Sequence, residues 1–122
     1  MKARGLVWLG TRTRNFDETV RFFGDTLGLR KSHEEPDFTV FRLPNGDTVE
    51  VFGPGDTGHE YFGSGPVAGF LVDDVKEARA DLEAAGISFL SPVRESHDGA
   101  AWSHFRGPDG NVYEVTTPAK QG

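Results

Sequence analysis

Two periods of hydrophobic and polar residues occur along the chain, one typical of helices and one typical of strands. Apolar side chains recur at helical spacing over 16–27 and over 75–85, which predicts two amphipathic helices. Residues suited to begin and end a helix flank both segments. The predicted N-cap and N3 pairs are Asn15 with Glu18 and Asp74 with Glu77, and the predicted left-handed C′ residues are Gly28 and Gly86.

Short apolar runs on both sides of each helix predict strands. One run precedes each helix, at 6–11 and 67–72, and one follows it, at 29–33 and 87–93. A hairpin signal comes next in each half, because Pro-Asn-Gly or Pro-Asp-Gly separates two runs that can alternate on a pleated surface. Each half of the chain is therefore predicted to fold as β-α-β-β-β.

The two hairpin segments indicate an internal duplication. They read FRLPNGDTVEVFGP at 41–54 and FRGPDGNVYEVTTP at 105–118, and seven of the 14 aligned positions are identical at a constant offset of 64. One such module covers only one face of its sheet with a helix, so two modules are expected to form an α+β fold with a curved mixed sheet around a cleft. The predicted organisation is a single domain over 1–122, with repeat 1 at 4–54, a linker at 55–65 and repeat 2 at 66–118.

Strand alternation predicts which side chains face this cleft. If Val49 and Val51 face the helix of the first repeat, Glu50 faces the cleft, and Glu114 does the same in the second repeat. The same alternation on the first strand turns Trp8 inward. The sequence leaves open the alternative that the two glutamates are exposed or form salt bridges with Arg12, Arg42 or Arg106.

The linker contains a formal match to the dinucleotide-binding pattern G-x-G-x-x-G at 53–58. Pro54 and the lack of an apolar helical pattern after Gly58 remove the helix N-terminus that would hold a pyrophosphate. We interpret the match as linker composition, since five glycines lie within 53–66, and we expect no helix there.

Composition narrows the function classes. The chain has 122 residues, no Cys and a formal net charge of −6, which excludes disulfide scaffolds, thiolate metal sites and cysteine nucleophiles. The acidic balance and the lack of a basic patch argue against a nucleic-acid partner. No apolar run approaches the roughly 20 residues that cross a bilayer, and no signal-peptide pattern opens the chain. We therefore expect a cytoplasmic protein with no membrane partner.

Two signatures make the sequence similar to the vicinal oxygen chelate superfamily, which groups glyoxalase I, extradiol dioxygenases and bleomycin-resistance proteins. The segment NFD at 15–17 followed by FFGDTLGL at 22–29 resembles the aromatic-pair and Leu-Gly motif of that family. The segment GPDGNVYEV at 107–115 resembles its closing turn and strand. The resemblance covers nearly the whole chain and implies the glyoxalase/bleomycin resistance-like fold.

The resemblance also implies where a metal ion would bind, because metal-dependent relatives carry His, Gln or Glu at four inward positions. The matching positions here are Trp8, Glu50, Val67 and Glu114. Trp8 and Val67 cannot coordinate, and two carboxylates without an imidazole make a poor zinc or ferrous site unless His104 turns inward. We expect no metal cofactor; if a divalent ion is present, Glu50 and Glu114 are its expected ligands.

With these residues at the four positions, the sequence most resembles the metal-independent bleomycin-resistance branch of the superfamily. That resemblance implies a homodimer that sequesters a flat aromatic, possibly cationic small molecule such as an antibiotic, without turnover. Trp8 would stack on the ligand, and Glu50 and Glu114 would stabilise its positive charge. No catalytic residue is predicted. The candidate ligand-binding residues are Trp8, Phe41, Glu50, Phe52, Val67, Trp102, His104 and Glu114.

Two alternatives stay open at this point. One is a metal-dependent lyase, isomerase or dioxygenase of the same superfamily, which uses Glu50, Glu114 and His104 on a metal or as acid and base. The other is a domain whose cleft is filled by its own side chains.

Overall fold

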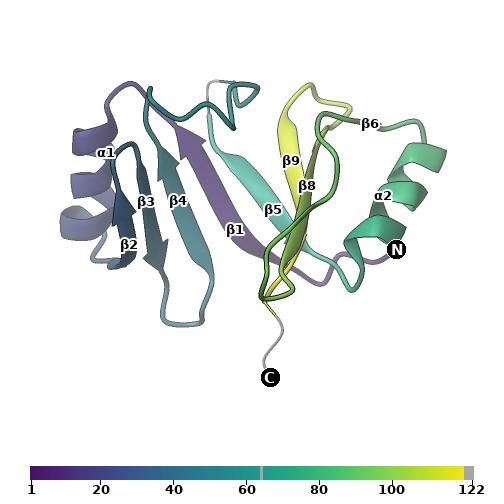
Figure 1. The fold of residues 1–122 in the computed structure, drawn as a ribbon, viewed down its shortest axis with the longest axis horizontal. Coiled ribbons are helices and arrows are strands. Elements are labelled where there is room, and N and C mark those ends of the chain that lie inside the picture. The colour runs from purple at the N-terminus through teal and green to yellow at the C-terminus, as the bar shows by residue number, and fades with distance from the viewer. Residues whose placement is uncertain (64, 120–122) are drawn as a thin grey trace. The chain divides into compact units, whose positions relative to one another are not determined.

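The computed structural model describes residues 1–63 and 65–119 and confirms the α+β fold class (Figure 1). The first half contains β1 (Gly5–Arg12), α1 (Phe16–Arg21), the π-helical segment η1 (Phe22–Thr26), β2 (Arg30–Glu35), β3 (Phe38–Arg42) and β4 (Thr48–Phe52). The second half contains β5 (Val67–Leu71), α2 (Val75–Ala84), β6 (Ser88–Phe89), β7 (Arg94–Glu95), β8 (Ala101–Arg106) and β9 (Val112–Thr117).

The chain divides into two compact units. The first unit comprises residues 8–67, and the second comprises residues 1–7 together with 68–122. Residues 4–7, which the sequence assigns to repeat 1, thus group with the second unit, where the backbone N–H of Arg4 donates to the carbonyl of Leu71. The repeat boundaries themselves stay a prediction.

The strands of the two units are paired in the same order. In the first unit β4 pairs in parallel with β1 and antiparallel with β3, which pairs antiparallel with β2. In the second unit β9 pairs in parallel with β5 and antiparallel with β8, which pairs antiparallel with the short strands β6 and β7. The expected mixed pairing of each β-α-β-β-β module is confirmed.

Each unit has a hydrophobic core between its helix and one face of its strands. Phe41, Val49 and Val51 are buried in the first unit, and side chains of α1 and η1 such as Val20 and Phe23 pack against them. The equivalent core of the second unit contains Val72, Val75, Ala78, Phe105 and Val115. Burial of each large apolar side chain contributes about 1.5–3 kcal/mol. The predicted alternation, with Val49 and Val51 toward the helix, is confirmed.

The two β-hairpins that carry the duplicated sequence have the same hydrogen bonds. The backbone N–H of Leu43 donates to the carbonyl of Asp47, and that of Gly107 donates to Asn111, each at 2.8 Å. Gly46 and Gly110 have positive φ angles of 91° and 85°, as these turns require. The guanidinium groups of Arg42 and Arg106 donate to the carbonyls of Gly46 and Gly110. These two arginines therefore close the hairpins. The alternative that Arg42 and Arg106 form salt bridges with Glu50 and Glu114 differs from these contacts.

The first helix differs from its prediction in two ways. Asn15 is its N-cap residue but makes no side-chain capping bond, so the expected pair with Glu18 is wrong. Asn15 has φ −99° and ψ 55°, outside the extended conformation of most N-caps, and its carbonyl accepts instead from the Thr19 hydroxyl. The second part of the helix is π-helical, since the N–H of Leu27 donates to the carbonyl of Phe22. Gly28 then ends the segment with a φ of 73°, as expected.

The second helix begins and ends as predicted, whereas the strand expected at 87–93 is wrong in extent. The Asp74 carboxylate accepts from the N–H of Glu77 at 2.9 Å, and Gly86 follows the helix with a φ of 91°. Within this range only β6 is a strand, and β7 follows it as a second short partner of β8. Pro92, which has no N–H to donate, lies between β6 and β7. No helix in the described part of the chain is long and apolar enough to cross a membrane.

Candidate functional site

The face of the first unit opposite α1 carries three predicted ligand-binding residues: Trp8, Glu50 and Phe52. Because side chains alternate along a strand, the inward packing of Leu9, Val49 and Val51 turns these three to the other side. The cross-strand register places Trp8 opposite Thr48 and Gly10 opposite Glu50. We call the surface formed by Trp8, Gly10, Glu50 and Phe52 the Trp8 face.

Trp8 is half-buried and lies across Gly10. The six-membered ring of its indole occupies the space that a Cβ on residue 10 would need, so any larger residue there would displace the ring. The Phe62 ring meets Trp8 edge to face with their centroids 6.2 Å apart. The indole is thereby held over Gly10, and its planar ring system is suited to stacking.

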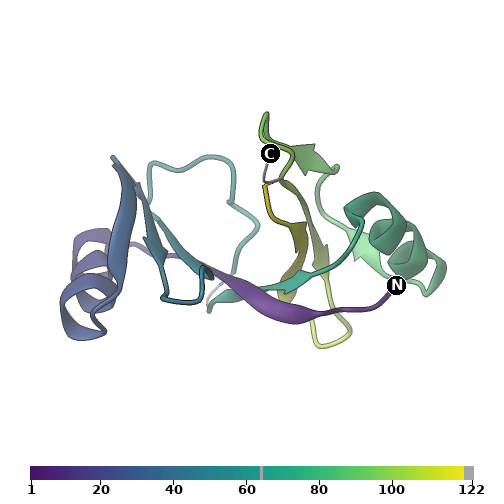
Figure 2. The same cartoon turned by 90° about the horizontal axis from the view of Figure 1, so that it is seen from below.

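The loop of residues 53–62 packs on the same face, although the sequence predicted only a linker there. The His59 ring stacks on Phe52 with centroids 4.0 Å apart and an interplanar angle of 25°. Phe62 contacts Phe52 edge to face at 5.8 Å. Figure 2 shows this loop and α1 on opposite sides of the first unit's strands. His59 is thus a candidate site residue that the prediction missed; the signal was Asp56-x-x-His59 within a turn-rich segment.

Two glycines of this loop are required by the packing of a neighbouring side chain. The match to G-x-G-x-x-G at 53–58 is therefore more than a result of linker composition. The Asp37 carboxylate lies so close to Gly53 and Gly55 that a Cβ at either position would overlap with it. Asp37 has a left-handed φ of 62°, and its carbonyl accepts from the N–H of Gly53 at 2.8 Å. The Gly-Pro-Gly sequence therefore permits a close approach of the backbone to a side chain.

His104 and Glu114 form a buried pair in the second unit, on the face of β8 and β9 opposite α2. The two residues are opposite each other in the cross-strand register, and the Nε2 of His104 lies 3.4 Å from Oε2 of Glu114. Their exposed fractions are only 2% and 4%. Burial lowers the pKa of His104 to about 4 and raises the pKa of Glu114 to about 8. At neutral pH both groups are therefore mainly uncharged.

The neutral state of Glu114 changes what this position can recognise. A protonated carboxyl donates and accepts hydrogen bonds but supplies no negative charge. The expectation that Glu114 would stabilise a cation is therefore not supported by its surroundings. The duplication could have revealed the pair. At the repeat offset of 64, His104 corresponds to Val40 and Glu114 corresponds to Glu50, and Val40 is opposite Glu50 in the first unit.

A catalytic metal ion would need several acidic or histidine side chains close together. Within 1–63 and 65–119, no group of three or more His, Cys, Asp or Glu side chains is placed to hold a metal ion. Catalytic zinc sites commonly use three protein ligands, and ligating carboxylates and imidazoles must be deprotonated. Glu114, with its raised pKa, would have to lose a proton before it could coordinate.

The other predicted residues lie in different surroundings. Phe41, which was expected to bind the ligand, does not lie on the Trp8 face. It is fully buried in the core beneath α1, where its ring is tilted against that of Phe23. Val67 is buried at the start of β5. Trp102 is half-buried on β8, opposite Thr116 and two residues from His104.

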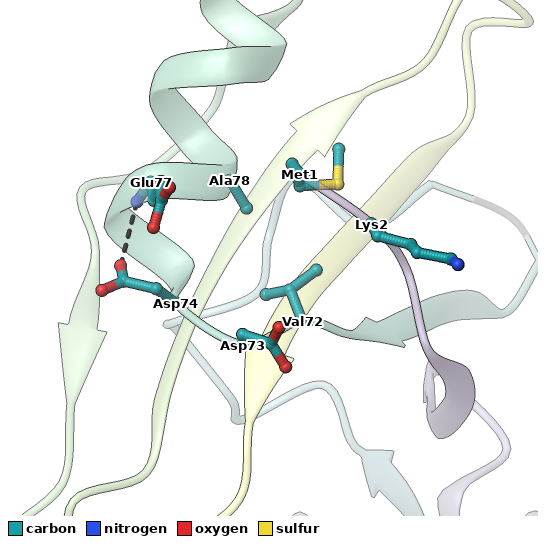
Figure 3. Close-up of a pocket in the computed structure, with 7 residues that line it drawn as sticks. All are labelled: Met1, Lys2, Val72, Asp73, Asp74, Glu77 and Ala78. Carbon is teal, nitrogen blue, oxygen red and sulfur yellow. Dashed lines mark hydrogen bonds between the residues drawn. The ribbon is translucent and has the colours of Figure 1, made fainter.

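A shallow hollow of about 300 Å³ lies at the start of α2 and contains none of the predicted site residues (Figure 3). Two of its carboxylates are already engaged, since Asp73 pairs with Arg4 and Asp74 caps the helix. The residues that line it are Met1, Lys2, Val72, Asp73, Asp74, Glu77 and Ala78.

Comparison with known proteins identifies the family of a chain with two β-α-β-β-β modules. The chain belongs to the Glyoxalase/Bleomycin resistance protein/Dioxygenase superfamily, whose family model matches residues 5–115. It is 29% identical over 116 residues to the uncharacterized protein YraH of Bacillus subtilis (strain 168), covering 83% of this chain and 88% of that protein.

Two solved structures show the same fold. Methylmalonyl-CoA epimerase from Mycobacterium tuberculosis matches with a TM-score of 0.74 and 19% identity, covering 97% of this chain and 90% of that one. The Mn(II)-bound glyoxalase from Novosphingobium aromaticivorans matches with a TM-score of 0.74 and 22% identity. That match covers 98% of this chain and 42% of the glyoxalase. At these identities the likeness concerns the fold alone.

Proposed function

We propose that this protein binds a flat aromatic small molecule without a resident metal ion and without chemical turnover. The observation that carries the proposal is the Trp8 face, where a half-buried indole covers Gly10 beside an aromatic cluster. Ligand sites are commonly apolar and aromatic with few polar groups, which matches this composition. Tryptophan at a position where metal-dependent relatives carry a ligand supports stacking in place of coordination.

The test uses the two tryptophans of the chain as reporters. Titration with planar aromatic compounds, antibiotics included, is expected to quench the fluorescence of the wild type. Trp8→Ala is expected to weaken binding about tenfold, because a stacking contact and its buried area are lost. Trp102→Phe separates the two reporters, since it removes the other indole, from the second unit, and keeps Trp8. Equal affinities of the wild type and Trp8→Ala would remove Trp8 from the site.

A second candidate function, acid–base catalysis as a lyase or isomerase, is favoured by one specific observation. His104 and Glu114 are buried side by side with shifted pKa values, and such groups cluster at functional sites. A protonated carboxyl next to a neutral imidazole can give a proton to a substrate and take one back.

Metal analysis separates the proposal from a metal-dependent enzyme of the superfamily. Protein purified without chelator is expected to contain well below one equivalent of nickel, zinc, iron or manganese. One tightly held equivalent, lost in Glu114→Gln, would contradict metal-independent binding and place the ion at that carboxylate.

A further inference from the structure

The Phe52 ring is covered by an aromatic ring from its own chain. His59 stacks on it at 4.0 Å and 25°, closer than the other near-parallel neighbour, Phe38, at 5.5 Å and 15°. Phe52 is consequently only 2% exposed. The imidazole therefore occupies the position on Phe52 where a ring of a bound molecule would stack.

Specific polar contacts hold His59 in this position. Its Nδ1 lies 3.0 Å from Oδ2 of Asp56, and the same oxygen accepts from the backbone N–H of His59 at 3.0 Å. Because a carboxylate only accepts, Nδ1 carries the proton in this contact. The Arg12 guanidinium donates to the Asp56 carbonyl at 3.4 Å, which ties the loop to β1.

We propose that His59 is a specificity-determining residue of the Trp8 face, where it limits ligands to planar molecules of at most two fused rings. This inference rests on the proposed aromatic-binding function. The indole of Trp8 offers a stacking surface about two fused rings in extent. Phe62 meets both this indole and Phe52, with ring centroids 6.2 Å and 5.8 Å apart, so Phe52 belongs to the same aromatic cluster. The imidazole of His59 is stacked on Phe52 and occupies the ring surface that a larger ligand would use there. A longer planar ligand would have to displace the ring and break its contact with Asp56.

The proposal predicts a change in size selectivity when the imidazole is removed. Pyridine, quinoline and acridine form a series of one, two and three fused rings that are mainly uncharged at pH 7.5. His59→Ala is expected to bind acridine roughly tenfold more tightly than the wild type does, as expected for one additional ring contact. Its affinities for pyridine and quinoline are expected to stay within about twofold. His59→Phe restores a ring and is expected to keep the wild-type selectivity.

Binding is measured by isothermal titration, with the indole N–H signals in ¹⁵N–¹H NMR spectra locating the probe. His97→Ala is the matched control, since it removes an exposed histidine of the second unit. If His59→Ala does not fold, Asp56→Asn carries the test, because it weakens the hold on the imidazole and is expected to shift selectivity the same way.

The outcomes distinguish a failure of the proposed role of His59 from a failure of the proposed aromatic-binding function. A folded variant with an unchanged ratio of acridine to quinoline affinity would overturn the role of His59, while quinoline binding at Trp8 would leave the proposed function intact. No binding of any probe by the wild type and by the variants would overturn the proposed function and this inference with it.

Discussion

At the scale of single residues, the duplication places two buried hydroxyl groups at equivalent positions with different surroundings. Thr39 and Ser103 are 64 residues apart, and both have an exposed fraction of 0%. The Ser103 hydroxyl donates to the Ser91 carbonyl at 3.1 Å and accepts from Arg79. The Thr39 hydroxyl has no hydrogen-bond partner in the described chain. A buried polar group without a partner costs about 1–3 kcal/mol.

Thr39→Val is therefore expected to raise the free energy of unfolding by about 1 kcal/mol, because valine has the same shape and no group to satisfy. Urea unfolding followed by circular dichroism measures the change. Ser103→Ala is the matched control and is expected to lower the same free energy by about 1–2 kcal/mol, since it leaves the Ser91 carbonyl and Arg79 without this contact. Destabilisation by Thr39→Val would show that the hydroxyl is satisfied in solution.

At the scale of elements, the two helices begin in different ways despite similar cap sequences. Asp74 accepts from the N–H of Glu77, whereas the Asn15 side chain accepts no capping bond. Periodicity and cap residues predicted where both helices lie. They could not predict the cap geometry of Asn15, because that depends on how the preceding strand delivers the chain to the helix.

Asp74→Ala is expected to lower the free energy of unfolding by about 1 kcal/mol, as loss of an N-cap bond commonly does. Asn15→Ala is the matched comparison and is expected to cost no more than about 0.5 kcal/mol, because no side-chain bond is lost. Both are measured by urea unfolding. An equal loss in the two variants would contradict the difference between the two caps.

At the scale of the whole molecule, the buried pair of His104 and Glu114 predicts how stability changes with pH. The pKa of Glu114 is raised from 4.5 to about 8, so its contribution is complete below pH 4.5 and is lost as pH rises through 8. The pKa of His104 is lowered from 6.5 to about 4, so its contribution is present above pH 6.5 and is lost as pH falls through 4. Between pH 4.5 and 6.5 the two slopes oppose each other.

The pair is therefore expected to leave stability nearly level from pH 4.5 to 6.5 and to lower it by about 2 kcal/mol between pH 6.5 and 8, where Glu114 still contributes a slope and His104 no longer does. Urea unfolding at a series of pH values measures this. Glu114→Gln cannot ionise and is expected to remove the fall above pH 6.5. The same fall in the variant would assign it to other groups.

The sequence by itself determined most of the helices and strands and the family. Helical periodicity, turn residues with their positive-φ glycines, and a repeat at a constant offset are local properties of the chain, so they are legible without coordinates. Alternation along β4 also predicted the side on which Glu50 lies, because successive strand residues always point to opposite faces.

Only the tertiary structure decided which side chains meet. It placed Phe41 in the core, folded His59 onto Phe52, and set His104 beside Glu114. These contacts join residues from different segments, and their distances depend on packing that no local pattern records. The protonation of Glu114 follows from its burial, which the chain acquires only when it is folded.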